Sequence, residues 1–119
     1  MTSERIGYHI LRLSLASVLL WFGFSQLFNG IEWVGWVPDW VVSFVHLPPA
    51  MIVLANGLFE VIAGALIAMN LFVRPVAALV AIHFAFITLE IGMTAIGVRD
   101  FGLTGAAAAL AFFASKKEN

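Results

Sequence analysis

Residues 47–69 read LPPAMIVLANGLFEVIAGALIAM, an apolar run in which Glu60 is the one charged side chain. The run is long enough for an α-helix to cross a bilayer, which takes about 20 apolar residues. Three more apolar runs lie at about 10–28, 75–98 and 102–115. Because a helix satisfies its own backbone hydrogen bonds in hydrocarbon, we predict an all-α fold: a single four-transmembrane-helix bundle over residues 1–119.

The composition supports this prediction. Hydrophobic residues make up 62% of the chain, the mean hydropathy is +1.02 and the net charge is −1. A soluble domain of this size cannot bury so much apolar surface, so the expected partner is the lipid bilayer, and nothing suggests nucleic acid. The chain has no Cys, which excludes disulfides, iron–sulfur ligation and thioether-linked haem within it. We therefore expect no covalently bound cofactor, and we expect the first run to be retained rather than cleaved as a leader.

The basic residues indicate an orientation. With four spans, both termini lie on one side of the membrane, together with the turn after the second run. That side carries Arg5, Arg12, Arg74, Lys116 and Lys117, and only Arg99 falls on the other. The positive-inside rule then predicts a multi-pass protein of the cytoplasmic (inner) membrane with both termini in the cytoplasm.

The connections between the runs differ in length. Residues 30–49 carry Trp33, Trp36 and Trp40 at an amphipathic spacing that Pro38 interrupts. This pattern is typical of an interfacial segment, and we interpret it as an anchor in the outer headgroups, with a lid over a pocket as the alternative. The connection at 69–75 is short, which predicts that the second and third spans are antiparallel neighbours.

The fourth run is unusually short. Residues 102–115 make about 21 Å of helix against a hydrocarbon core of about 30 Å, so Arg99 and Asp100 are expected at the outer interface. Gly102 and Gly105 offer small surfaces for close helix approach, and a homo-oligomer is one use of such surfaces.

Polar side chains inside the runs are few and costly. An Asp or Arg at the membrane centre costs about 2.5 to 3.5 kcal/mol on insertion scales, so such residues are functional candidates by default. Asn56 and Glu60 are four residues apart, and His83 and Glu90 are seven apart, so each pair shares a helix face.

Depths follow from a rise of 1.5 Å per residue, counted from the expected outer ends of the helices. Gln26 is then about 3 Å deep, Asn56 about 10 Å, Glu90 about 12 Å and Glu60 about 16 Å. His83 is about 22 Å deep, toward the cytoplasmic side. We therefore predict a polar pocket that opens to the outer leaflet, with the candidate ligand-binding residues Gln26, Asn56, Glu60, Glu90, Arg99 and Asp100.

Within this pocket Glu60 is the candidate for proton exchange. Arg12, which shares a helix face with Gln26, and His83 are further candidates. Structural interpretations stay open for each of them. A protonated Glu60 bonded to Asn56 or to the backbone of a neighbouring helix would only fix packing, and His83 on an apolar face is more often a packing residue than a ligand.

Other interpretations concern ion pairs and cofactors. Glu90 and Arg99 are a candidate structural ion pair between the third and fourth spans. A b-type haem needs two facing His residues, and His9 and His46 lie near opposite helix ends, away from His83. Glu60, Glu90 and His83 have suitable ligand types for a divalent metal, but their spacing singles out no site, so we predict none.

Several short motifs occur in a recognisable order. From Arg12 a Leu-rich stretch leads into WFGFSQLF at 21–28, which resembles the opening of the DoxX family. Residues 57–64 read Gly-x-x-Glu-x-x-x-Gly, and Arg74 and RDFGL at 99–103 continue the same pattern. The chain departs from it at Gln26, where many members carry Lys, which weakens any anion-binding role at the outer cluster.

The resemblance implies a four-helix membrane bundle related to the membrane subunit of thiosulfate:quinone oxidoreductase and found with redox proteins. Arg12, Glu60, Arg99 and Asp100 match family positions. Our first hypothesis is accordingly a redox-associated membrane subunit that binds a quinone or another small lipophilic molecule and works with redox partner proteins. The alternatives are a small proton-coupled transporter and a structural or assembly subunit without activity of its own.

Overall fold

The computed structural model of the protein describes residues 2–118, with side chains described through Ala114. Over this range the chain is helical and contains no β-strand. The elements follow in the order α1 (Ser3–Phe28), η1 (Gly30–Glu32), η2 (Val34–Trp36), α2 (Asp39–Val45), α3 (Pro49–Ala68), α4 (Val73–Ile91) and α5 (Ala95–Glu118). The predicted all-α class is therefore confirmed.

Four of the helices have the length and composition to cross a membrane. They are Ser3–Phe28, Pro49–Ala68, Val73–Ile91 and, within α5, Ala95–Ala114. Large apolar side chains such as Leu58, Leu79, Leu89 and Phe112 are more than half exposed on the outside of the bundle. Since water does not tolerate so continuous an apolar surface, this exterior faces lipid, and the protein is a multi-pass membrane protein.

The break between α4 and α5 differs from the sequence prediction. We expected the third span to reach residue 98 and the fourth to begin at 102, whereas α4 ends at Ile91 and α5 begins at Ala95. Gly92 takes a positive φ of 70°, a conformation that glycine adopts without strain, and the Thr94 Oγ1 atom accepts a hydrogen bond of 3.0 Å from the Gly97 N–H. The turn contains no proline or charge, so hydropathy runs through it unbroken. With its earlier start, the fourth span has about 30 Å of helix and no longer falls short of the bilayer.

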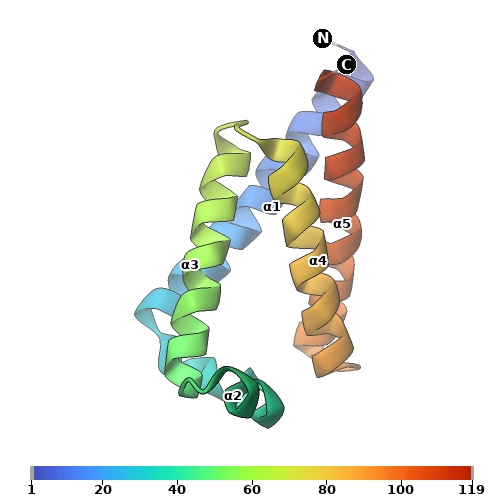
Figure 1. The fold of residues 1–119 in the computed structure, drawn as a ribbon. Helices are drawn as coiled ribbons and strands as arrows, with labels where there is room; N and C mark the ends of the chain where they lie inside the picture. Colours follow the sequence, from blue (N-terminus) through green and yellow to red (C-terminus); the bar gives the residue numbers. More distant parts are fainter. Residues whose placement is uncertain (1, 119) are drawn as a thin grey trace.

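The four long helices form two pairs. Helix α1 packs mainly along α3, and α4 packs mainly along α5, with far less packing between the pairs (Figure 1). The α3–α4 turn lies at the same end as the start of α1 and the end of α5, and α2 lies at the opposite end. Helices α3 and α4 are close at their shared turn and diverge toward the α2 end, so the predicted neighbours are in contact over only part of their length.

Glycines bring α1 and α3 together. A Cβ added at Gly23 would lie 2.8 Å from the Val61 Cγ2 atom and 2.9 Å from its backbone nitrogen, and one at Gly57 would lie 2.9 Å from the Gln26 Cβ atom. Gly64 is similarly close to Leu20. Only glycine fits this crossing, and it holds the polar residues of the two helices in register.

The glycines that we singled out in the fourth span have no such role within the chain. A Cβ added at Gly102 or Gly105 would meet none of the described residues within 4 Å. Within the chain, the close helix approach occurs between α1 and α3 instead, and a use of Gly102 and Gly105 in a homo-oligomer stays a prediction.

The apolar core occupies one half of the bundle. Its buried side chains come from α1 as far as Leu19, the second half of α3, α4 as far as Phe84 and the second half of α5; they include Ile67, Val80 and Leu110. All of these segments lie toward the end where α1 begins. In the other half of the bundle, toward α2, a cavity lies between the helices.

Candidate functional site

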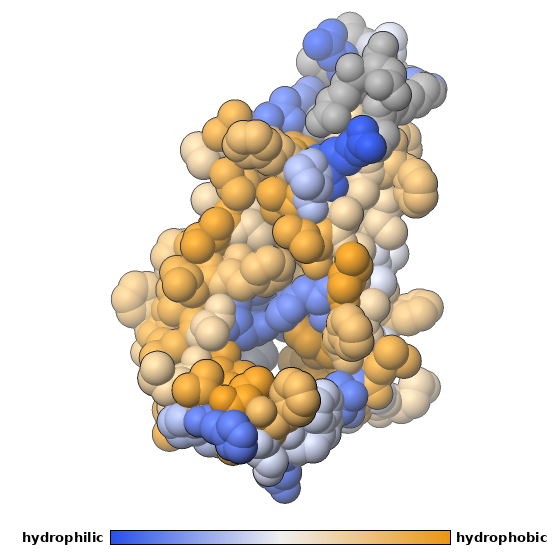
Figure 2. All heavy atoms as spheres, viewed as in Figure 1, coloured by the Kyte–Doolittle hydropathy of each residue, from blue (hydrophilic) through white to orange (hydrophobic). Residues whose placement is uncertain are grey.

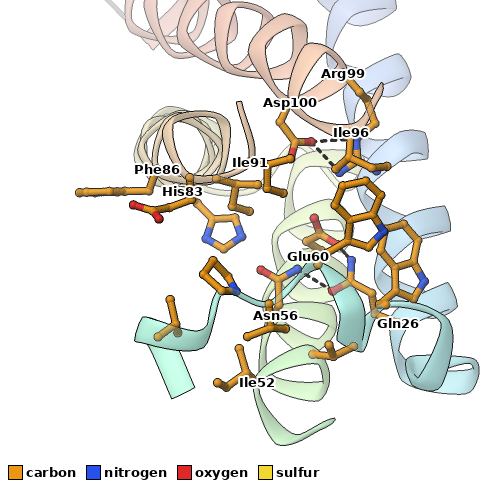
Figure 3. A pocket seen from close by; sticks show the side chains of 18 of the residues that line it. Gln26, Ile52, Asn56, Glu60, His83, Phe86, Ile91, Ile96, Arg99 and Asp100 are labelled. Atoms are coloured by element: carbon orange, nitrogen blue, oxygen red, sulfur yellow. Dashed lines mark hydrogen bonds and ion pairs between the residues drawn. The ribbon is translucent and has the colours of Figure 1, made fainter. Parts of the chain in front are cut away.

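A cavity of about 360 Å³ lies between the two helix pairs, at the α2 end. Every long helix and the connection between α1 and α3 contribute to its wall (Figure 3). Most of the lining is apolar or aromatic, and the polar minority is Gln26, Asn56, Glu60, His83, Glu90, Arg99 and Asp100. The structure thus brings together all six residues of the predicted outer cluster and adds His83.

Gln26, Glu60 and Asn56 form a hydrogen-bonded chain on one wall. The Gln26 Nε2 atom donates to Glu60 Oε2 at 2.7 Å, and the Asn56 Nδ2 atom donates to Gln26 Oε1 at 2.5 Å (Figure 3). Gln26 and Glu60 are almost fully buried, with 4% and 1% of their surface exposed. Asn56 therefore orients Gln26, and Gln26 contacts Glu60. Although Asn56 and Glu60 share a face of α3, they are connected through Gln26.

Arg99 and Asp100 form the charged wall. The Arg99 Nε atom donates to Asp100 Oδ1 at 2.8 Å, and the guanidinium also forms an ion pair with this carboxylate. The Arg99 Cζ atom lies 4.1 Å from the centre of the Phe22 ring, and Trp33 is the next ring, at 6.0 Å. Because α5 begins at Ala95, this pair lies in its second turn, inside the span, where mutual pairing and the aromatic ring offset the cost of burying the charges.

Glu90 has a different partner from the one we considered. Its Oε2 atom accepts a hydrogen bond of 2.6 Å from the Trp40 Nε1 atom of α2. The carboxylate that pairs with Arg99 is Asp100, so the interpretation of Glu90 and Arg99 as an ion pair between α4 and α5 is wrong. The local reason is that Asp100 follows Arg99 directly on the same helix turn.

The tryptophan segment closes the cavity at its α2 end. Trp33, Trp36 and Trp40 all line it, together with Pro38, which precedes the first turn of α2. The Trp33 Nε1 atom donates to Ser25 Oγ at 3.0 Å and fixes the start of the segment against α1. The segment therefore has the geometry of a cover, and its placement in the outer headgroups stays a prediction.

His83 lies nearer the α2 end than we predicted. Its ring packs against Phe59 at 4.6 Å and Phe84 at 5.5 Å between ring centres, and it lines the cavity on the side opposite Gln26 (Figure 3). The depth of about 22 Å was wrong because α4 ends at Ile91, which leaves His83 only about 12 Å from that end. His83 therefore packs against aromatic rings and also forms part of the cavity wall.

Arg12 lies outside the cavity. It is buried, and its Nη1 atom donates to the backbone oxygens of Ile67 at 2.8 Å and Ala68 at 2.7 Å. These are carbonyls of the last turn of α3, which lack partners within their own helix. Arg12 thus ties α1 to the end of α3, which is a structural role, and its further candidacy as a site residue stays a prediction.

Three buried polar atoms around the cavity have no hydrogen-bond partner in the described part of the chain. They are His83 Nε2, Arg99 Nη1 and Asp100 Oδ2. Buried polar groups are normally paired, so these atoms leave hydrogen-bonding capacity at the cavity wall. Among the described residues, no group of three His, Asp or Glu side chains is arranged to hold a metal ion.

Sequence reasoning missed the apolar walls. Ile52 and Val53 precede Asn56 by about one helix turn, Phe86 and Ile87 precede Glu90 in the same way, and all four line the cavity. The helical spacing of three and four residues from a polar candidate is the signal that finds them. Apolar positions in a membrane span otherwise resemble lipid-facing ones, so only the polar neighbours distinguish them.

The family comparison agrees with this architecture. The DoxX family model matches residues 7–95, which include nearly all of α1 and the whole of α3 and α4. Arg99 and Asp100 lie beyond the matched range. No curated protein and no solved structure matches the chain. Since the family model covers well over half of the sequence, this four-span membrane protein belongs to the DoxX family.

Proposed function

We propose that this protein is a redox-associated membrane subunit that binds a quinone, or another small lipophilic molecule, in the cavity between its helix pairs. The observation that carries the proposal is a mostly apolar and aromatic cavity whose wall holds a buried carboxyl, Glu60, within a hydrogen-bonded chain. A ligand with an apolar body and a few polar atoms matches such a site. The resemblance to a family found with redox proteins favours a quinone.

Glu60 is the residue to which we assign proton exchange. Reduction of a quinone to a quinol consumes two electrons and two protons, and oxidation releases them. Glu60 would hold or release a proton at its carboxyl, with Gln26 fixing its orientation and Asn56 fixing Gln26. The electrons would come from or go to a partner redox protein, because this chain has no Cys to ligate an iron–sulfur cluster.

The remaining polar residues would bind and orient the ligand. Arg99 keeps one unpaired nitrogen and Asp100 one unpaired oxygen, and His83 Nε2 is a third unpaired atom on the far side. Carbonyl and hydroxyl groups, which a quinone and its quinol carry, are suitable partners for these atoms.

We assign the protein to the cytoplasmic membrane, with its termini in the cytoplasm and the cavity toward the outer leaflet. The support is the position of Arg5, Arg12 and Arg74 at the end opposite α2. A reporter that works only in the cytoplasm should be active when it is fused after residue 119. If instead a reporter that works only outside the cytoplasm is active there, the assigned orientation is reversed.

Native mass spectrometry of the gently purified protein, followed by organic extraction, tests the main proposal. We expect a co-purifying quinone, and we expect Glu60→Gln to weaken its binding by about tenfold. Glu32→Gln is the matched control, because Glu32 is exposed in η1 and does not line the cavity. Unchanged binding and unchanged activity of the assembled complex in Glu60→Gln would overturn the proposal.

A structural subunit is the second candidate, and one observation favours it. The Gln26–Glu60 bond joins α1 to α3, and such a bond fixes helix packing whether or not a ligand binds. The test is a triple change of Glu60, Arg99 and Asp100 to Gln, Leu and Asn. Preserved assembly and preserved partner activity would favour the structural role, and lost partner activity in a correctly assembled complex would exclude it.

A further inference from the structure

We propose that the ligand is a tailed amphiphile, whose polar head lies in the cavity and whose hydrocarbon tail leaves sideways between α3 and α4 into the bilayer. This inference rests on the proposed function and specifies the class of ligand and its route. It follows from where the cavity is closed and where it is open.

The cavity is open between α3 and α4. These two helices diverge from their shared turn toward the α2 end, and they pack against each other only sparingly (Figure 1). Figure 2 shows the opening in the space-filling view: near the middle of the molecule, hydrophilic residues are visible behind a hollow whose two sides are hydrophobic. The polar wall is therefore reachable from the side of the molecule that faces lipid.

The opening lies at the depth of the hydrocarbon. Ile52 is three residues from the start of α3, or about 5 Å, and Phe86 is five residues from the end of α4, or about 8 Å. Phe86 lines the cavity but is 67% exposed, so it lies at the margin of the cavity. Figure 3 shows its ring on the far side from Gln26. A tail passing Ile52 and Phe86 would contact these apolar side chains and then lipid.

The end of the cavity is covered. Trp36, Pro38 and Val41 line it from the connection between α1 and α3. The Trp40–Glu90 hydrogen bond fastens α2 to the last turn of α4, and so bridges the two helix pairs over the cavity. A water-soluble ligand arriving from the aqueous side has to displace this cover, whereas a lipid-soluble one does not.

The test compares two quinones in nanodiscs: a decyl-substituted benzoquinone and the same head with methyl groups only. Trp33, Trp36 and Trp40 line the cavity, so a bound quinone quenches their fluorescence. All variants carry Trp21→Phe, because Trp21 is 66% exposed to lipid and would report dissolved quinone.

The cavity is narrowed just inside the opening by Ile52→Phe together with Ile87→Phe, since Ile87 lines the cavity next to Phe86. The matched control is Leu54→Phe with Leu89→Phe, which adds the same groups to the same helices at exposed residues outside the cavity. We expect the narrowed variant to bind the decyl quinone about tenfold more weakly and the tail-less head with less than about twofold change. The control should bind both as the parent does.

A second variant tests the same route independently, in case the narrowed variant does not fold. Trp40→Phe removes the hydrogen bond to Glu90, and we expect faster association of the tail-less head with no change for the decyl quinone. If narrowing changes both ligands equally or neither, or if Trp40→Phe speeds up the decyl quinone as well, the lateral route is wrong while the quinone site stands. If the parent protein binds neither quinone, the proposed function itself fails, and this inference with it.

Discussion

The indole nitrogen of Trp40 in α2 donates a hydrogen bond of 2.6 Å to a carboxylate oxygen of Glu90, fifty residues further along the chain in the last turn of α4. The α1–α3 connection is otherwise fastened to its own helix pair, through the bond from Trp33 to Ser25. The Trp40–Glu90 bond therefore joins the two pairs at the end where they pack least.

Replacing Glu90 with Ala should loosen α2. A hydrogen bond to an exposed carboxylate contributes about 1 kcal/mol, so the amides of residues 39–45 should exchange with deuterium about fivefold faster. Hydrogen–deuterium exchange with mass spectrometry measures this. Glu32→Ala, in the exposed η1, is the control, and equal exchange in the two variants would show that the bond does not hold the cover.

Replacing Gly23 with Ala should separate α1 from α3. The added Cβ would lie 2.8 Å from a Val61 side-chain atom and 2.9 Å from its backbone nitrogen, and the backbone cannot yield cheaply. We expect a loss of about 1 to 3 kcal/mol in the free energy of unfolding, together with weaker quinone binding, because the Gln26–Glu60 bond depends on this crossing.

Gly102→Ala is the matched control for this change. Nothing among the described residues lies within 4 Å of the added Cβ, and alanine favours helix over glycine by up to about 1 kcal/mol. Thermal unfolding followed by circular dichroism compares the two. A Gly23→Ala protein that melts at or above the parent temperature would refute the close crossing.

Replacing Arg12 with Leu should destabilise the fold without altering the cavity. The backbone oxygens of Ile67 and Ala68 lose a charged donor, and the Ile67 oxygen keeps the 3.1 Å hydrogen bond from the Asn70 N–H, so the change should cost about 1 to 3 kcal/mol. Unfolding titrations in detergent measure the loss, with Ser17→Ala as a control because Ser17 is exposed and bonds within its own helix. A specific loss of quinone binding in a stable Arg12→Leu protein would return this residue to the site.

Arg99 and Asp100 should show strong thermodynamic coupling. Asp100 is fully buried, so Asp100→Asn leaves the Arg99 charge uncompensated and should cost about 3 kcal/mol. The double variant Arg99→Leu with Asp100→Asn removes both charges and should cost less than the two single changes combined. A double-mutant cycle of unfolding free energies measures the coupling, and additive effects would contradict the pairing.

The sequence predicted the polar constellation better than the helix limits. Asn56 and Glu60 lie on one helix face because of their spacing, and Gln26 meets them because a small residue, Gly23, shares its face in α1; both relationships follow from helical periodicity. The turn at Gly92 was not predictable from hydropathy, because no charged or proline residue interrupts the apolar run there. That one turn moved Arg99 and Asp100 into the span and His83 toward the cavity.

The partners of the charged residues could not be predicted either. Arg12 shares a helix face with Gln26, which suggested a common site, but the two residues lie about 21 Å apart along that face. The expected depths of Glu90 and Arg99 in the membrane suggested that these two residues pair. Glu90 instead bonds to Trp40, because α2 folds back over the bundle. Such choices are made by tertiary packing, which a single sequence does not report.

The uneven packing of the bundle has a mechanical consequence. Interlocked side chains brace the half near the start of α1. In the half that holds the cavity, the two pairs are joined by the connection, the Trp40–Glu90 hydrogen bond, and the contacts of Arg99 with Phe22 and of His83 with Phe59. Lateral pressure from the surrounding acyl chains therefore acts on a lightly braced opening. The width of the cavity is set partly by the lipids, so a thicker or more ordered bilayer should squeeze it and a thinner, more fluid one should relax it.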